Sequence, residues 1–154
     1  MRRTFAFAAI LVCVGSAMAQ IATDSPRKPE RPAEAAQMAA LEKAIAPYVA
    51  KAKASYPTAK LRFLRGLPQG EKFFVTTRLR DLDGTFEQVF ILVARIDGNR
   101  ISGKISSQIM LVKSFHSGQS FSFDDAELLD WVITKPDGTE EGNFVGKFLD
   151  TYKQ

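Results

Sequence analysis

The stretch Phe73–Ile96, FFVTTRLRDLDGTFEQVFILVARI, decides the fold of this chain. In residues 73–80, one set of side chains alternates with another, and this period of two predicts a strand. The first set is Phe73, Val75, Thr77 and Leu79, and the second is Phe74, Thr76, Arg78 and Arg80. Asp83-Gly84 then marks a hairpin turn. Residues 86–96 form the longest apolar run after the N-terminal one, which predicts a central strand. Because so short a turn can join only antiparallel neighbours, the stretch predicts an antiparallel hairpin.

Turn signals divide the rest of the C-terminal half into further short strands. Asp97-Gly98-Asn99 and Pro136-Asp137-Gly138 are the strongest of these signals. Strands are expected at 100–106, 121–123, 130–135 and 139–143. Asp124 and Glu127 have the spacing of a capping box that opens one helical turn. Residues 145–152 predict a short terminal helix.

Residues 33–56 are Ala-rich, and their apolar side chains recur at intervals of three and four, which predicts a helix. Pro47 is expected to kink this helix or split it near Ala46, because the proline ring clashes with the preceding turn. Tyr56-Pro57 is expected to end it. We therefore expect a single α+β domain over residues 33–154. It would consist of a Pro-kinked N-terminal helix packed on an antiparallel meander of five to six short strands, with a short C-terminal helix.

The first nineteen residues have the tripartite pattern of a secretory signal peptide. Arg2 and Arg3 precede the apolar run 5–14, and Ala17 and Ala19 occupy the A-x-A positions. The apolar run is about half of the ~20 residues that a membrane-spanning helix needs, so a retained anchor is the weaker alternative. We expect a Sec-type signal that is cleaved after Ala19, and a periplasmic or secreted protein.

Composition narrows the function classes further. Residues 20–32 hold three of the seven prolines and are expected to form a flexible leader. The only Cys, Cys13, leaves with the signal, and the only His, His116, cannot build a zinc cluster alone, so neither a metal nor a cofactor is expected. Cleavage lowers Lys+Arg from 21 to 19 against 17 Asp+Glu, so the net charge falls from +4 to +2. Little positive charge then remains to favour a nucleic-acid partner.

Trp131 is the most informative candidate for a site, and two adjacent carboxylates are a weaker one. A sole Trp on a short strand is most often a core anchor whose indole N–H needs a partner, with ligand stacking as the alternative. Glu140 and Glu141 are neighbours on an expected strand, where side chains alternate between faces. We therefore do not expect these two carboxylates to act as an acid/base pair.

Four weaker candidates have ordinary structural explanations. A group of carboxylates could bind Ca²⁺ through oxygen ligands, but its spacing does not follow the known calcium loop, and a helix cap explains part of it. This group is Asp124, Asp125, Glu127 and Asp130. A basic stretch could bind phosphates, or it could be the solvated end of the helix. This stretch is Lys51, Lys53, Lys60, Arg62 and Arg65. His116 could shuttle a proton, but its surroundings predict a surface turn, and Ser106, Ser107 and Ser117 lack the context of a nucleophile.

Several short motifs together resemble a known family. They are Ala54-Ser55-Tyr56-Pro57, Glu87-Gln88-Val89-Phe90, Ile101-Ser102-Gly103-Lys104-Ile105, Ser117-Gly118-Gln119, Leu129-Asp130-Trp131 and Glu141-Gly142-Asn143-Phe144. In this combination, over roughly residues 38–152, the chain resembles the YegJ-like family, a bacterial domain of unknown function. Asn143 departs from the pattern, since many members carry a second Gly there. The resemblance implies a fold and a domain boundary, and it brings no catalytic residues with it.

The leading hypothesis is a small exported, non-enzymatic module that binds an envelope protein or another component of the cell envelope. Its expected binding residues surround the one Trp and a Gly-containing turn. They are Asp130, Trp131, Glu141, Gly142 and Asn143. One alternative is a hydrolase with Asp130 or Glu141 as general base, which needs a carboxylate of raised pKa in a concave pocket. The other is an immunity-like or structural envelope protein.

Overall fold

The computed structural model describes residues 32–152, with side chains from residue 36 onward. The signal peptide expected over residues 1–19 and the leader up to residue 31 lie outside the described residues. Pro32, which we placed in the leader, is the first residue of the helix α1 (Pro32–Arg65). Proline fits the first turn of a helix because the N–H that it lacks would have no partner there.

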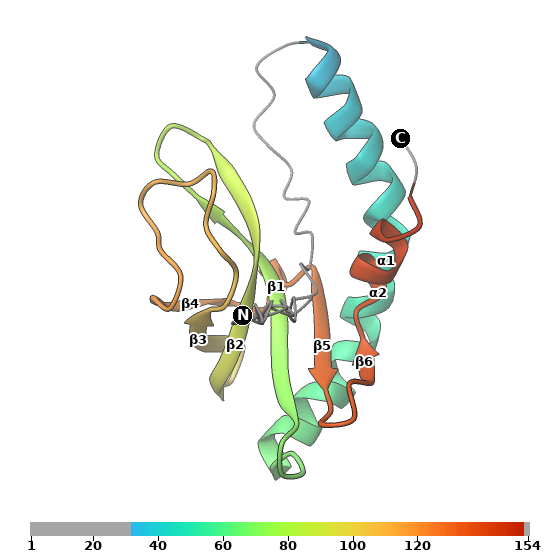
Figure 1. Cartoon of the computed structure of the whole chain (residues 1–154), viewed down its shortest axis with the longest axis vertical. Coiled ribbons are helices and arrows are strands. Elements are labelled where there is room, and N and C mark those ends of the chain that lie inside the picture. Colours follow the sequence, from blue (N-terminus) through green and yellow to red (C-terminus); the bar gives the residue numbers. More distant parts are fainter. Residues whose placement is uncertain (1–31, 153–154) are drawn as a thin grey trace, which may run out of the picture.

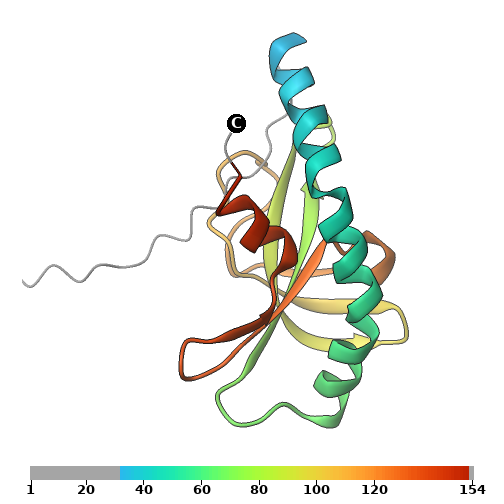
Figure 2. The same ribbon diagram turned by 90° about the vertical axis from the view of Figure 1, so that its right-hand side faces the viewer.

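The helix α1 is one continuous element of 34 residues. The expectation that it ends at Tyr56-Pro57 is therefore wrong, and it is not split at Pro47. Both prolines are exposed, so water can hydrate the carbonyl groups that lose their helical donors. Figure 2 shows that α1 runs along the sheet. The side of α1 opposite these prolines is buried along a stripe. This stripe is Ile45, Ala52, Tyr56 and Ala59.

Six antiparallel strands form one sheet in the order β4-β3-β2-β1-β5-β6 (Figure 1). The strands are β1 (Lys72–Arg80), β2 (Phe86–Asp97), β3 (Arg100–Ile105), β4 (Ser120–Asp124), β5 (Asp130–Thr134) and β6 (Glu140–Gly142). This confirms the α+β class. The order departs from a simple meander at β5, which returns across the fold to pair with β1 rather than with β4.

The return from β4 to β5 passes through one short turn of 3-10 helix, η1 (Asp125–Glu127). The expected capping box is confirmed, because the side chain of Asp124 accepts the N–H of Ala126 and the side chain of Glu127 accepts the N–H of Asp124. The backbone N–H of Leu129 then donates to the carbonyl of Thr76 on β1, 2.8 Å away. The chain ends in the short helix α2 (Phe144–Leu149), which lies beside α1 (Figure 2).

The two faces of the sheet have different surroundings. On the inner face, which α1 covers, Val75 lies opposite Ile91 on one side and Trp131 on the other, and all three are buried. The outer face is the opposite one, on which Thr76 lies between Phe90 and Asp130. The hydrophobic core therefore lies between α1 and the inner face.

Candidate functional site

The five expected binding residues lie close together along the chain's last two strands. Asp130 and Trp131 are on β5, Glu141 and Gly142 are on β6, and Asn143 directly precedes α2. In the ladder between these strands, Val132 is opposite Gly142 and Ile133 is opposite Glu141. The backbone N–H of Asn143 donates to the carbonyl of Trp131, 2.7 Å away, and so extends this pairing up to α2. The structure therefore brings these five residues together.

Trp131 is a core residue of the inner face, with 7% of its surface exposed. Its indole Nε1 donates to the carbonyl of Ala52 at 3.2 Å and to the Ser55 hydroxyl at 3.0 Å, both on α1. The ring also meets Phe73 and Phe144 in edge-to-face contacts. Trp131 thus fixes the sheet to both helices, which is the role of an anchor with a satisfied indole N–H.

Asp130 holds the beginning of α2. Its carboxylate accepts the N–H of Trp131 at 2.8 Å and the N–H of Val145 at 2.7 Å. Asn143, which occupies the position before the helix, makes no side-chain capping bond. Asp130 therefore caps α2 from a neighbouring strand. Burial raises the pKa of Asp130, although its hydrogen bonds from backbone N–H groups act in the opposite direction.

Gly142 and Asn143 make the sharp turn from β6 into α2. Both have left-handed backbone conformations, with φ of 79° and 55°. A Cβ at position 142 would lie 2.2 Å from the carbonyl oxygen of Trp131, so glycine is required there by space as well as by conformation. Asn143 donates through Nδ2 to Glu140 at 2.8 Å.

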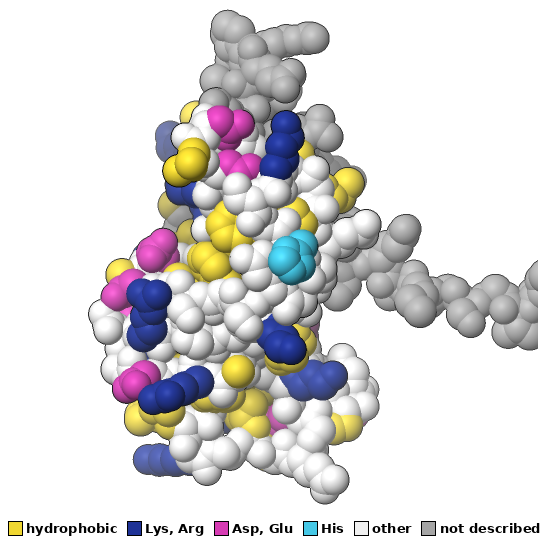
Figure 3. All heavy atoms as spheres, turned by 90° about the vertical axis from the view of Figure 1, so that its left-hand side faces the viewer, with side chains coloured by type: hydrophobic (Ala, Val, Ile, Leu, Met, Phe, Trp, Pro, Cys, Tyr) yellow, Lys and Arg dark blue, Asp and Glu magenta, His cyan; other side chains and the backbone are white. Residues whose placement is uncertain are grey.

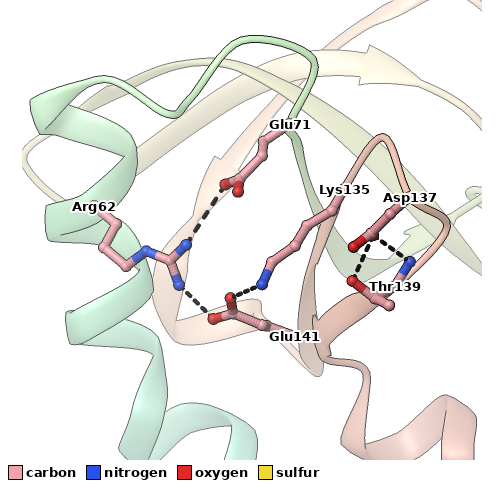
Figure 4. Close-up of polar contacts among 6 residues, drawn as sticks. All are labelled: Arg62, Glu71, Lys135, Asp137, Thr139 and Glu141. Atoms are coloured by element: carbon pink, nitrogen blue, oxygen red, sulfur yellow. Dashed lines mark hydrogen bonds and ion pairs between the residues drawn. The ribbon is translucent and has the colours of Figure 1, made fainter.

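Glu141 belongs to a small network of ion pairs at the edge of the inner face (Figure 4). Its carboxylate is 2.7 Å from Lys135 Nζ, it accepts a hydrogen bond from Arg62 of α1, and Arg62 also pairs with Glu71. The hydrogen bonds from Lys135 and Arg62 lower the pKa of Glu141. Glu140 contacts other groups, Asn143 and Lys147. This difference agrees with the expectation that the two carboxylates do not act as a pair.

Because the pKa of Glu141 is lowered in the folded protein, its ion pairs stabilise the fold at pH values above 4.5, the ordinary pKa of a glutamate. This stabilisation is lost as the pH falls through the lowered pKa. We expect Glu141→Gln to reduce the free energy of unfolding at pH 7 by at most about 1 kcal/mol, since the side chains of Arg62, Lys135 and Glu141 are partly exposed to solvent. Urea unfolding at several pH values measures this. The difference from wild type should vanish in acid, and a difference that persists at low pH would contradict the assignment.

The acidic set proposed for calcium has structural roles. Asp124 and Glu127 form the capping box of η1. Asp125 pairs with Lys60 Nζ at 2.9 Å, and Asp130 caps α2. Within the described residues, no group of three or more His, Cys, Asp or Glu side chains is placed to hold a metal ion.

The basic stretch of α1 binds the rest of the fold rather than projecting as a separate patch. Lys53 Nζ donates to the carbonyl of Ala126 at 2.7 Å, and Lys60 Nζ donates to the carbonyl of Gly98 at 2.6 Å. Lys51 lies over the ring of Phe144, 4.9 Å from its centroid. Arg62 is part of the network around Glu141, and Arg65 is exposed in the last turn.

The remaining candidates lie in the long segment between β3 and β4. His116 is exposed, and its backbone carbonyl accepts the N–H of Gln119 in a turn, as the sequence predicts. Ser106 and Ser117 are exposed, whereas Ser107 is buried and accepts the N–H of Phe90 at 2.8 Å through its hydroxyl. None of these contacts places a base beside a serine.

The outer face of the sheet contains a groove of about 800 Å³. Its floor comes from β2, β1 and β5, and its two walls come from residues 106–110 and from α2. We call this the outer-face groove. Its floor residues are Lys72, Phe74, Thr76, Gln88, Phe90, Asp130, Val132 and Thr134. Asp130, Glu140 and Asn143 contribute to its lining, whereas Trp131, Glu141 and Gly142 do not.

One wall of the outer-face groove is fixed by a buried carboxylate that the sequence analysis missed. Glu87 on β2 is 2% exposed, and its oxygens accept the N–H groups of Met110, Leu111 and Val112 at 2.7–3.2 Å. Asp81 accepts two further N–H groups from the same segment. One signal was available in the sequence. Glu87 has the same strand parity as the apolar side chains that point inward, which for a charged residue requires buried partners.

Figure 3 shows the side of the molecule on which β3, β4 and the segment between them lie. Hydrophobic side chains reach the surface at several points there, and Lys and Arg side chains gather toward the lower half. On this face the basic side chains are separated by neutral and apolar ones. That arrangement lacks the continuous basic stripe of a nucleic-acid footprint.

Comparison with known proteins yields one family. The family described as "Uncharacterized protein conserved in bacteria (DUF2314)" matches residues 40–151. No curated protein matches the chain, and neither does any solved structure. The YegJ-like name itself stays a prediction. No helix within the described residues is long and apolar enough to span a membrane.

Proposed function

The chain belongs to the bacterial family DUF2314, which is uncharacterized, and we propose that it is an exported, non-enzymatic module that binds an extended polypeptide segment of an envelope protein. The observation that carries this proposal is the outer-face groove, which lies on the sheet face opposite α1. The expected binding region is thereby revised. Of the five expected residues, Asp130 and Asn143 line the groove, and Glu140 joins them. Trp131, Glu141 and Gly142 lie outside the lining.

The lining of the groove suits a polypeptide better than a polyanion. Apolar side chains from three adjacent strands form its centre. They are Phe90 of β2, Phe74 of β1 and Val132 of β5. Around them lie neutral hydroxyl and amide groups, which can both donate and accept hydrogen bonds and so match the backbone of an extended chain. These groups are Thr76, Gln88, Ser106, Gln108, Thr134 and Asn143. Phosphate-rich ligands are disfavoured because three of the four charged lining residues are carboxylates.

The hydrolase alternative gains support from one observation. Asp130 lines the groove and burial raises its pKa, which are the two properties that a carboxylate general base needs. Its two oxygens, however, already accept the N–H groups of Trp131 and Val145. Glu141 lies outside the groove and has a lowered pKa. Peptide hydrolysis by the wild type that is abolished in a folded Asp130→Asn variant would favour the hydrolase.

Export is the part of the proposal that rests on residues 1–19. We expect the protein to be recovered from the periplasmic or extracellular fraction with Gln20 as its first residue. N-terminal sequencing of protein expressed in a bacterial host measures this. A variant with Ala17 and Ala19 both changed to Asp should keep its signal peptide, and recovery of an uncleaved wild-type chain in the cytoplasmic fraction would contradict export.

The groove itself is tested through Met110, a wall residue that is 73% exposed. We expect Met110→Glu to weaken binding of a partner segment at least tenfold, because the added carboxylate must be desolvated against an apolar floor. Leu82→Glu is a matched control, since Leu82 is fully exposed at the tip of the β1–β2 hairpin and does not line the groove. A photo-crosslinking residue at position 110 identifies the partner segment, and fluorescence polarisation with the synthetic segment measures its affinity.

These two substitutions separate groove binding from general stickiness. Equal losses in Met110→Glu and Leu82→Glu, or no loss in either, would contradict the groove as the binding face. Neither substitution should alter folding, because both side chains already face solvent.

A further inference from the structure

We infer that the segment bound in the outer-face groove is basic: an extended peptide that carries Lys or Arg among apolar side chains. This inference rests on the proposed function and adds the chemistry of the partner.

Four charged side chains line the groove, and they are Lys72, Asp130, Glu140 and Asp150. Asp130 is buried, and backbone N–H groups occupy its oxygens. Glu140 and Asp150 are exposed residues, so their carboxylates can contact a partner. Lys147 Nζ lies 3.7 Å from Glu140 and offsets part of its charge. Asp150, directly after α2, adds a second carboxylate on the same side of the groove.

The single lysine of the lining lies on the other side. Lys72 on β1 is opposite Thr134 on β5, which is in turn opposite Glu140 on β6. Two strand spacings of about 4.8 Å therefore separate the backbones of Lys72 and Glu140. The exposed charges of the lining therefore differ across its width, with Lys72 over β1 and the carboxylates Glu140 on β6 and Asp150 directly after α2 on the other side. A basic side chain of a bound segment is expected to point toward α2.

The apolar part of the partner follows from the floor and the exposed wall. Phe74, Phe90 and Val132 give the floor an apolar centre, and Met110 stands at its margin. The backbone of Met110 is held by Glu87, but its side chain is 73% exposed. An unbranched thioether side chain can repack around different apolar groups. The groove therefore suits an apolar residue at the centre of the segment and a basic residue next to it.

The test uses the full chain and three fluorescein-labelled nonapeptides with the same apolar positions and with Lys, Gln or Glu between them. At low ionic strength we expect the Lys peptide to bind at least fivefold more tightly than the Gln peptide, and the Glu peptide to bind most weakly. The double variant Glu140→Gln/Asp150→Asn should weaken the Lys peptide about fivefold and leave the Gln peptide unchanged. Asp97→Asn is the control for loss of negative charge outside the groove, because Asp97 is exposed and does not line it. It removes one carboxylate, whereas the double variant removes two.

The outcomes distinguish failure of the basic partner from failure of the groove as the binding face. If all three peptides bind equally and Met110→Glu weakens them all, a basic partner is excluded while the groove remains the binding face. If the Lys peptide is preferred but the double variant binds it as well as the wild type does, this assignment of the carboxylates is overturned. If no peptide binds, the proposed function fails together with the inference.

Discussion

Replacing Glu87 with Gln is expected to lower the free energy of unfolding by about 2–4 kcal/mol. Glu87 is almost fully buried, and its two oxygens accept three consecutive N–H groups, with a shortest distance of 2.7 Å to Leu111. A glutamine of the same size offers one oxygen, and its amide group would point a donor at N–H groups that are donors themselves. Urea unfolding, followed by the fluorescence of the single, buried Trp131, measures the loss.

Asp81→Asn is the matched control for Glu87→Gln. Asp81 also accepts two backbone N–H groups of the same segment, from Lys113 and Ser114. Water reaches this carboxylate, so it can replace the lost hydrogen bonds, and the loss should be much smaller. Hydrogen exchange should also speed up at residues 110–112 in Glu87→Gln. Equal losses in the two variants would contradict a specific role for the buried carboxylate.

The shape of the groove depends on the hydrogen bonds of Glu87, because they fix the wall that carries Met110. A segment without regular hydrogen-bonded structure needs partners for its N–H groups, and Glu87 supplies them from the adjacent strand. Loss of these bonds should therefore weaken peptide binding even where the variant remains folded. In this way the stability of the core and the shape of the outer-face groove are linked through one side chain.

Local patterns predicted most of the elements. The alternation in residues 73–80 and the capping box at Asp124 are confirmed, because each depends on neighbours in sequence. The end of α1 could not be predicted from Tyr56-Pro57, since the cost of a proline in a helix depends on whether water reaches the freed carbonyl. Only the folded structure places Pro57 on the exposed side.

The site was harder to predict because its parts come from distant segments. The sequence analysis grouped Asp130 with Asn143, and the hydrogen bond from the N–H of Asn143 to the carbonyl of Trp131 holds Asn143 beside this end of β5. It could not show that β5 returns to β1, and this return completes the floor of the groove with Phe74 and Thr76. It also could not show whether Trp131 faces a ligand or α1, because periodicity assigns alternate residues to two faces without saying which face is covered.

Gly142→Ala is expected to be the most damaging single-methyl change in the region, with a loss of about 2–5 kcal/mol. Two effects add in this variant. Alanine is strained at a φ of 79°, and its Cβ would lie 2.2 Å from the carbonyl oxygen and 2.7 Å from Cε3 of Trp131. Neither of these neighbours can move easily, because the indole N–H donates a hydrogen bond to Ala52 of α1 and the carbonyl accepts the N–H of Asn143.

Gly138→Ala separates these two effects. Gly138 has nearly the same backbone conformation, with a φ of 82°, but its Cβ would meet no atom within 4 Å. This variant should therefore show only the conformational cost, about 1–2 kcal/mol. The difference between the two variants, measured by urea unfolding, gives the cost of crowding Trp131. If both lose equally, β6 can move away from the indole at no cost. The wall that α2 contributes to the groove would then not depend on the close contact between Gly142 and Trp131.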